Sequence, residues 1–398
     1  MVQAEEALRI ALESSDRVGE LTVTLDSACG LILAEDIHAD TDLPCIDAAA
    51  CDGFALRGGE LRYEIPMKNS MEDPGSVALS PGKAFPVLRG DPLPEGTDRI
   101  VPAAEATVED TVIYLDRIPM PGANVHSRGE SASTGQLVLE RGSRLSQQHL
   151  GIAALAGREV LRVCRRPVTG LMSVGERIVP STWRPAPGRS RDPVIPLLKG
   201  QLRCCGFTPR MTVQASPERE RLTSALRQAT GCCEVLLVSG GAGPVSEALE
   251  DMGFSFLFRM VAQHPAGSFA CSKGPGGETV FLLPDEPLPA MISTEEYVLP
   301  CLRRMSGFKG CRKRVYAGET TFDYGKEPGR MHFLAVLAYR EGNDWKLHLP
   351  DPGIPGDLMG SMSVNALAVA GADQLSVRAG DLMSFHFLCS AAGELSFA

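Results

Sequence analysis

The pattern of apolar and polar positions divides the 398-residue chain into segments of different character. Residues 1 to about 45 begin with apolar residues spaced among polar ones, which predicts an amphipathic helix, and then become strand-like at LTVTL. Residues 52 to about 139 place short apolar runs between Gly and Pro, a pattern typical of a small β domain with long connections. The next segment, SQQHLGIAALAG, predicts a helix that Ser146 caps and Gly157 ends, and REVLRVCRRP then predicts a strand.

Strands and helices alternate between residues 167 and about 307. The predicted strands are PVTGLMSV, CEVLLVS and ETVFLLP, and the predicted helices include VIPLLKGQLRCCG and a helix from about Leu288. Another helix is expected in SPERERLTSALRQATG, with Ser216 as N-cap, Pro217 at the first helical position and Gly231 at the C-terminus. Continuous apolar strands that alternate with helices indicate a mostly parallel sheet covered on both faces.

Strand patterns return beyond Cys311. RMHFLAVLAYREGNDWKLHL predicts two strands around a turn, and QLSVRAGDLMSFHFL predicts a second such pair. The tail is therefore expected to be a small β domain of roughly 80 residues. The predicted fold class is a multi-domain α/β and β protein.

Composition narrows the class of protein. Hydrophobic residues make up 44% and charged residues 22%, as in ordinary globular proteins, and the net charge of −10 argues against a general nucleic-acid binder. We expect a cytoplasmic protein without a membrane partner, because no stretch approaches the length of a membrane span and the N-terminus lacks the features of a signal peptide. The 12 cysteines form no CxxC pair, so we expect buried thiols rather than zinc ligands or disulfides.

Two loops that follow predicted strands could carry chemistry, because ligands of open α/β sheets bind at the carboxyl ends of strands. The glycine loop from Ser239 to Gly243 would expose backbone N–H groups to a phosphate or another anion, and the alternative is a plain tight turn, since the spacing matches neither GxGxxG nor the P-loop. Glu176, in VGERI, could bind a metal, act as a base or cap the next element. The seven histidines show no metal-ligand spacing.

A further candidate is Asp52, in LPCIDAAACDGFALRGG. Asp-Gly is a turn signal that needs no chemistry. Alternatively, Asp52 is a carboxylate whose small neighbours allow a ligand to approach the backbone. The basic run between Arg303 and Arg314 is typical of a solvated linker.

Several segments, taken in order, resemble the molybdopterin molybdotransferase family, which completes the molybdenum cofactor. LPCIDAAACDGFALR is similar to its Asp-Asn-Ser-Ala-Met-Asp-Gly-Tyr-Ala motif, LRGDPLPEGTDRIV to Thr-Gly-Ala-x-x-Pro-Glu-Gly-Ala-Asp, and NVHSRGES to Asn-x-Arg-x-x-Gly-Glu-Asp. SVGERI is similar to Thr-Gly-Asp-Glu-Leu, VSGGAG to Ser-Gly-Gly-Val-Ser, and LLPDEPLPA to Leu-Pro-Gly-Asn-Pro-Val. GDLMGSMSVNAL resembles a serine-containing motif near the family's C-terminus.

The resemblance implies four domains: an elongated helix and strand domain (1–50 plus 140–166), an inserted β domain (51–139), an α/β molybdopterin-binding-like domain (167–306) and a C-terminal small β barrel (307–398). It implies a homodimer whose cleft combines the α/β domain of one subunit with parts of the other. The implied reaction inserts molybdate into adenylylated molybdopterin, with Mg²⁺, and releases AMP. Asp52 and Glu176 would be the catalytic and metal-binding residues. The implied substrate-binding residues are Ser239, Gly240, Gly241, Pro284, Pro287 and Ser361.

The sequence departs from the family pattern at several ligand-facing positions. Asp285 and Glu286 stand where the family has Gly and Asn, and the family's Pro-Gly-Lys-Pro segment reads HPAGS, without its lysine. Other departures are Arg89, His126, Ser131 and Gly175. Added carboxylates and lost cations weaken binding of a phosphate-rich ligand. The alternatives to the family reaction are therefore a catalytically inactive protein that binds a ligand or a partner, and an enzyme with an altered substrate.

Overall fold

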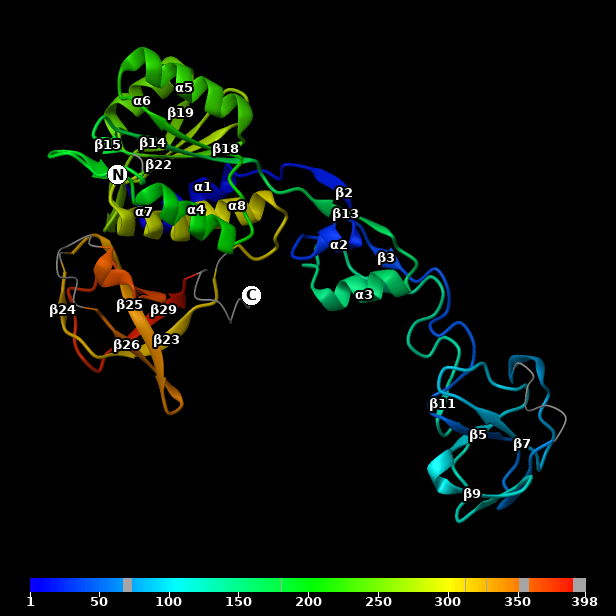
Figure 1. The fold of residues 1–398 in the computed structure, drawn as a ribbon. Coiled ribbons are helices and arrows are strands. Elements are labelled where there is room, and N and C mark those ends of the chain that lie inside the picture. The colour runs from blue at the N-terminus through cyan, green and yellow to red at the C-terminus, as the bar shows by residue number, and fades with distance from the viewer. Residues whose placement is uncertain (67–73, 180, 312, 327, 351–357, 389–398) are drawn as a thin grey trace. The chain divides into compact units, whose positions relative to one another are not determined.

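The chain folds into two compact units (Figure 1). This computed structural model describes residues 1–66, 74–179, 181–311, 313–326, 328–350 and 358–388. Unit 1 comprises Met1–Leu21, Gly30–Ile32 and Cys164–Ala398, and unit 2 comprises Thr22–Cys29 and Leu33–Val163. The finer division into four domains stays a prediction.

Unit 1 contains the predicted, mostly parallel sheet. Its strand order is β17-β14-β18-β22-β21-β19, and the first four strands run parallel to one another. The last two pair in antiparallel fashion. The strands are β14 (Thr169–Val174), β17 (Met211–Ala215), β18 (Val235–Ser239), β19 (Ser255–Phe258), β21 (Ala270–Lys273) and β22 (Thr279–Leu283).

Helices cover both faces of this sheet, as the continuous apolar strands predicted. Leu237 belongs to a buried cluster with one set of helices, while its neighbour Val238 belongs to a cluster with the other set. Figure 1 shows α5 and α6 on one side of the sheet and α1, α4 and α7 on the other. The helices are α1 (Ala4–Glu13), α4 (Val194–Cys204), α5 (Arg219–Cys232), α6 (Ala242–Asp251), α7 (Pro287–Ser293) and α8 (Leu299–Met305). A π-helical segment, Thr294–Val298, joins α7 to α8.

The predicted start of α5 is wrong by two residues, since Pro217 was expected at the first helical position. The helix begins at Arg219, because Glu218 has a non-helical backbone and its carbonyl accepts the first helical hydrogen bond, from Leu222 N at 2.8 Å. The hydroxyl of Ser216 accepts a hydrogen bond from Glu218 N at 3.2 Å, so it stabilises the turn before the helix. The predicted end is close to the observed one, with Gly231 inside the last turn.

The C-terminal part of unit 1 is a closed small β barrel. Strand pairings run from β25 to β26, β23, β29 and β27, and β27 pairs with β25 again. The strands are β23 (Tyr316–Thr320), β25 (Met331–Glu341), β26 (Asp344–His348), β27 (Ala366–Ala370) and β29 (Leu382–Phe387). β25 also pairs with β20 (Val261–His264), which pairs with β1 (Val2–Gln3).

One of the two hairpins predicted in this region is present. β25 and β26 pair around the expected turn, with Glu341 opposite Asp344. The other prediction is wrong, because β28 (Ser376–Val377) pairs with β24 (Tyr324–Gly325) and not with β29. β29 is already bonded on both sides within the barrel, so neither of its edges is open to β28.

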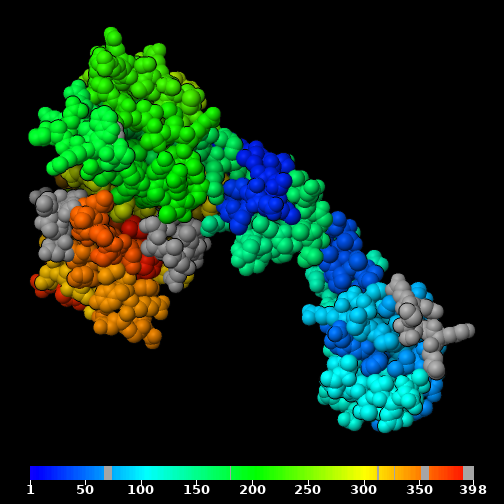
Figure 2. Space-filling view, in the orientation of Figure 1, coloured from blue at the N-terminus to red at the C-terminus, as the bar shows by residue number. Residues whose placement is uncertain are grey.

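Unit 2 is built mainly from short antiparallel strands, as the Gly- and Pro-rich pattern predicted. Two sheets, ordered β7-β5-β8 and β6-β10-β9, contribute to two buried hydrophobic clusters. Figure 2 shows the outer surface of this part of unit 2 in cyan and light blue. The strands are β5 (Gly53–Leu56), β6 (Arg62–Glu64), β7 (Ala84–Val87), β8 (Arg99–Pro102), β9 (Ala106–Glu109) and β10 (Val112–Leu115).

The rest of unit 2 consists of two-stranded ribbons and helices. α3 (Gln147–Leu155) follows the expected N-cap, Ser146, and Gly157 ends it with a positive φ of 76°. The boundary between the units crosses a ribbon of β2 (Glu20–Thr24) and β13 (Val160–Cys164). The remaining elements are α2 (Leu25–Ala28), β3 (Ile37–His38) with β12 (Leu137–Leu139), and β4 (Ala48–Ala49) with β11 (Val125–His126).

Helix length and cysteine burial are two further features of the fold. Among the described residues, no helix has both the length and the apolar character needed to cross a bilayer. The expectation of buried thiols is right for Cys164, Cys233, Cys271 and Cys301, where burial raises the thiol pKa of the last to about 12. It is wrong for Cys29, Cys45, Cys204 and Cys232, which are exposed, and for Cys205, which is in a disulfide.

Candidate functional site

The strand order of unit 1 reverses between β14 and β18. From β14 the chain continues to β17 on one side, and it then returns to β18 on the other side. At such a reversal the connections diverge from adjacent strand ends and leave a crevice in which α/β proteins bind ligands. A cavity of about 420 Å³ lies at these ends, lined by Gly175, Glu176, Ser239, Gly240 and Asp285. We refer to it as the switch-point cavity.

The cavity brings together residues that are far apart in the sequence. Three of the predicted site residues, Glu176, Ser239 and Gly240, line it. They are joined there by Asp285, one of the two departures from the family motif. The full lining also includes Ser173, Val174, Arg177, Ile178, Ser190, Arg191, Asp192, Pro193, Val194 and Pro217.

The glycine loop has a backbone conformation that only glycine adopts without strain. Gly240 has a φ of 80° and Gly241 a φ of 61°. A Cβ atom on Gly240 would lie 2.5 Å from the carbonyl oxygen of Val174, so a side chain is also excluded by contact. Ser239 Oγ fixes the loop by donating a hydrogen bond to the carbonyl of Pro284 at 3.2 Å.

The loop leads into α6, whose first turn receives no side-chain cap from the residues that the structure describes. The first N–H groups of a helix have no partner within the helix and carry partial positive charge. At α4, whose first residue Val194 lines the cavity, Asp192 Oδ1 accepts hydrogen bonds from Val194 N at 2.9 Å and Ile195 N at 3.2 Å. The start of α6 is therefore suited to binding an anion, while the start of α4 already has its carboxylate.

Glu176 is exposed, and its carboxylate makes no hydrogen bond or ion pair with the described part of the chain. The suggestion that it caps the next element is not supported by any contact of its carboxylate among the described residues, and the first N–H groups of the next helix, α4, are bonded to Asp192 instead. Its carboxylate is thus available to a metal, a base function or a ligand at the rim of the cavity.

The comparison of motifs missed two arginines that line the cavity, Arg177 and Arg191. Arg177 directly follows Glu176, and its position after a strand end was the available signal. Arg191 is brought to the cavity by the pairing of β15 (Ile178–Val179) with β16 (Ser190–Arg191), which residue spacing does not reveal.

The remaining predicted residues of unit 1 lie in different surroundings. Pro284 accepts the hydrogen bond of Ser239, and Pro287 is the first residue of α7. Ser361 ends a short 3-10 segment, Met359–Ser361, where its hydroxyl donates to Leu358 O at 2.7 Å. Ser361 does not line the switch-point cavity.

Asp52 belongs to unit 2, where it lies at the start of β5. Its Oδ1 accepts a hydrogen bond from Arg89 N at 2.8 Å, so two positions of the quoted motifs meet. The following Gly53 is required by packing, because a Cβ atom there would lie 2.0 Å from the carbonyl oxygen of Val101 in β8. The Asp-Gly pair thus has a structural role, and the side chain of Asp52 remains at the surface.

A second group of motif residues lies around the ribbon of β4 and β11. β4 pairs with β11, which places Ala48 opposite His126. Arg128, two residues further on, donates from its backbone N to Asp47 Oδ1 at 2.7 Å and from Nε to Asp42 Oδ2 at 2.6 Å. Hydrogen bonds from Thr134, together with Arg128, lower the pKa of Asp42 to about 2.

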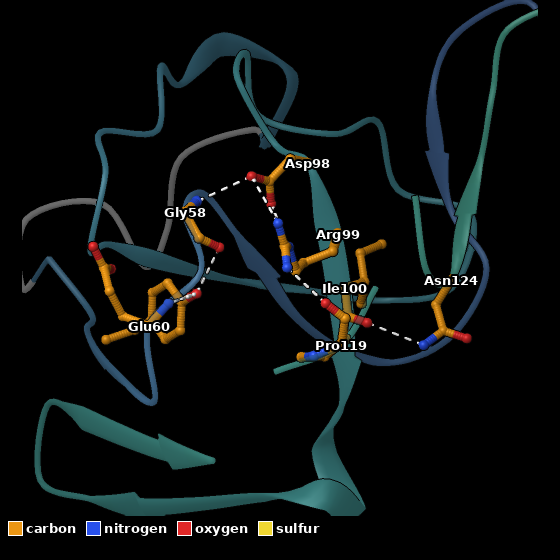
Figure 3. A network of polar contacts seen from close by, with 8 residues as sticks. Gly58, Glu60, Asp98, Arg99, Ile100, Pro119 and Asn124 are labelled. Carbon is orange, nitrogen blue, oxygen red and sulfur yellow. Dashed lines mark hydrogen bonds and ion pairs between the residues drawn. The ribbon is translucent and has the colours of Figure 1, made fainter. Parts of the chain in front are cut away.

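The Glu-Gly-Thr-Asp segment of unit 2 carries a structural network (Figure 3). Asp98 accepts a hydrogen bond from Gly58 N at 3.0 Å and pairs with Arg99, whose Nη1 donates to Pro119 O at 2.6 Å. Asn124 closes the same region by donating to Ile100 O at 3.0 Å. Arg99 is only 8% exposed, so these contacts hold the loops around β8 and are not accessible to a ligand.

The predicted metal-binding carboxylates do not share a unit, since Asp52 is in unit 2 and Glu176 in unit 1. Within the described parts of the chain, no group of three or more His, Cys, Asp or Glu side chains has the geometry to hold a metal ion. Mg²⁺ commonly takes one or two carboxylates and completes its shell with substrate phosphates and water. The carboxylate oxygens of Asp52 and Glu176 are of the type that fits Mg²⁺. The described residues contain no site formed by protein side chains alone.

Taken together, the sheet, the switch-point cavity, the small barrel and the β-rich unit define a multi-domain α/β protein with a glycine loop at its switch-point cavity. The sequence matches two protein-family models, "MoeA N-terminal region (domain I and II)" over residues 2–157 and "Probable molybdopterin binding domain" over residues 170–304. The chain belongs to the molybdopterin molybdenumtransferase family, as its motifs predicted.

Similar proteins cover most of the chain. A molybdopterin molybdenumtransferase of Staphylococcus epidermidis is 24% identical over 340 residues, which span 82% of this chain and 81% of that protein. Molybdopterin molybdenumtransferase 1 of Mycobacterium tuberculosis is 25% identical over 405 residues, 92% of this chain and 94% of that one. The crystal structure of a molybdopterin biosynthesis MoeA protein from Pyrococcus horikoshii superimposes with a TM-score of 0.81 at 22% identity, over 99% of this chain and all of the other, and shows the same fold.

Proposed function

We propose that this protein acts in molybdenum cofactor biosynthesis, where it inserts molybdate into adenylylated molybdopterin and releases AMP. The observation that carries the proposal is the switch-point cavity, where Ser239 and Gly240 of the glycine loop line the same space as Glu176. The loop leads directly into the uncapped start of α6. This cavity lies within the residues that match the molybdopterin-binding family. A phosphate-bearing substrate is the chemistry that such a loop recognises.

The residues of the loop have distinct parts in this proposal. The N–H groups of Gly240 and Gly241 would donate to the phosphate, and Ser239 would hold the loop through Pro284. Pro287, at the start of α7, and Ser361, in the C-terminal part, are further proposed substrate-binding residues, by likeness to the family motifs alone. Molybdate is a substrate of the proposed reaction and not a resident cofactor.

Asp52 and Glu176 are the proposed catalytic and Mg²⁺-binding carboxylates. The cation would supply charge neutralisation to the adenylyl phosphate and to molybdate. We also propose that the protein is a cytoplasmic homodimer, in line with the motifs that it shares with its family. A chain divided into several small domains favours association, because small domains bury limited apolar surface alone.

Release of AMP tests the proposal. Purified protein is incubated with adenylylated molybdopterin, molybdate and Mg²⁺, and AMP is measured by chromatography. We expect Mg²⁺-dependent release by the unsubstituted protein and none by Asp52→Ala. The hydrogen bond from Arg89 N is the only contact that this variant loses among those described for the side chain, so the cost in folding stability is about 1 kcal/mol.

Asp116→Ala is the matched control for this experiment. Asp116 is an exposed aspartate of unit 2 without a described side-chain contact, so its removal should leave AMP release unchanged. If the unsubstituted protein releases no AMP, the catalytic proposal is wrong. A role as a non-catalytic binding protein would then be favoured, and Asp285, beside the glycine loop, would be its first explanation.

A further inference from the structure

Two arginines, Arg177 and Arg191, lie at the switch-point cavity, and no carboxylate among the described residues pairs with either. We propose that they bind a phosphate group of the ligand and so determine the specificity of the cavity for a phosphate ester or anhydride. This inference rests on the proposed function for the identity of the ligand, and it is tested separately from catalysis. Both side chains line the cavity together with the glycine loop.

The two arginines come from the two strands of one short ribbon. β15 and β16 pair in parallel, with Ile178 opposite Ser190 and Val179 opposite Arg191. Arg177 directly precedes β15, and its carbonyl accepts a hydrogen bond from Ser190 N at 2.9 Å. The pairing therefore brings the two arginines to one ribbon at the cavity, although they are 14 positions apart in the sequence.

The base of this ribbon is held by the α/β sheet. Gln214, at β17, donates from Nε2 to the carbonyl of Ile178 at 3.0 Å, and Val179 is only 5% exposed. Ile178 also packs closely over Gly175, where a Cβ atom would lie 2.9 Å from Ile178 Cδ1. A fixed backbone beneath the arginines reduces the entropy lost when they bind a ligand.

The guanidinium groups of Arg177 and Arg191 are not engaged by the carboxylates of the cavity and can bind a ligand. Among the described contacts, Arg177 has no side-chain hydrogen bond or ion pair, and Arg191 donates only from Nε, to the carbonyl of Trp183 at 2.9 Å. Asp192, the acid next to Arg191, is engaged with the start of α4. Two guanidinium groups with unused N–H donors match the oxygens of a phosphate, which Arg can bind in a bidentate manner.

These arginines also answer the charge deficit seen in the motifs. The family lysine is absent from HPAGS, and Asp285 adds negative charge at the glycine loop. Arg177 and Arg191 place two positive charges at the cavity that Asp285 lines, from the ribbon of β15 and β16. The phosphate would then lie between the ribbon and the glycine loop.

Calorimetry with inorganic pyrophosphate as the probe tests the inference in the full-length protein. We expect Arg177→Gln and Arg191→Gln each to raise the Kd about tenfold, since a hydrogen-bonded charge pair is lost. The double variant should bind more weakly still and depend less on ionic strength. Arg189→Gln is the control, because Arg189 is exposed on the same ribbon and does not line the cavity.

Three results would overturn the inference: no pyrophosphate binding by the unsubstituted protein, unchanged binding by both single variants, or an equal loss in Arg189→Gln. Tryptophan fluorescence verifies that each variant is folded. The result does not depend on turnover. If the protein binds pyrophosphate through both arginines but releases no AMP, this inference holds and the proposed reaction is wrong. If the protein releases AMP but the arginine variants bind pyrophosphate normally, the proposed reaction holds and this inference is wrong.

Discussion

Substitution of Gly240 by alanine should destabilise unit 1 by a predictable amount. At a φ of 80°, a residue with a Cβ atom is strained by about 1–2 kcal/mol. The new methyl group would also lie 2.5 Å from the carbonyl oxygen of Val174, and overpacking of this kind costs about 1–3 kcal/mol. We therefore expect Gly240→Ala to lower the free energy of unfolding by roughly 2–5 kcal/mol.

Gly243→Ala is the matched control three residues away. Gly243 lies inside α6, and a Cβ atom there would meet no other atom within 4 Å. This variant should be more stable by about 0.5–1 kcal/mol, because alanine favours the helix. Urea unfolding followed by fluorescence measures both, since the two tryptophans of the chain, Trp183 and Trp345, belong to unit 1. If the urea midpoint of Gly240→Ala equals that of the unsubstituted protein, the predicted strain and contact at Gly240 are wrong.

Three further predictions concern charge and assembly. Glu234 accepts hydrogen bonds from Arg165 and from Val168 N, and Arg165 is the larger cause of the lowered pKa of Glu234. The contribution of Glu234 to folding stability is therefore present above the unfolded-state pKa near 4.5 and is lost as the pH falls through the folded-state pKa. Glu234→Gln should thus be less stable at pH 7, with a difference that shrinks in acid-unfolding curves. Asp285→Gly combined with Glu286→Asn should raise the affinity for molybdopterin in calorimetry, because two negative charges are removed; equal or weaker binding would contradict it. Light scattering at micromolar concentration should give the mass of a dimer, and a monomer mass would exclude the proposed assembly.

The sequence predicts the elements of unit 1 well where local and long-range preferences agree. Val235–Ser239 is apolar throughout because both faces of its strand are covered, so its pattern identified a central parallel strand. The start of α5 was misplaced because the hydroxyl of Ser216 bonds to Glu218 N in a turn, which an N-cap rule does not distinguish from a helix start. The partners of β28 and β29 follow from closure of the barrel, a long-range condition that a local turn cannot reveal.

The candidate site was predictable to the extent that it follows from a general rule of α/β sheets. Glu176, Ser239 and Gly240 come after strand ends, and the structure brings them to one cavity. Arg191 was not found because its position depends on the pairing of two short strands. The association of Asp52 with Arg89 is likewise a tertiary contact, since 37 positions separate them.

The closed barrel has a consequence for shortened forms of the chain. β29 is hydrogen-bonded to β23 on one side and to β27 on the other. A premature stop before Leu382 would therefore expose the backbone edges of both neighbours at once, and unpaired strand edges are templates for aggregation. Nonsense mutations that remove β29 should accordingly act as severe alleles, with the product removed by proteolysis or deposited as insoluble protein, even though the switch-point cavity is encoded far upstream.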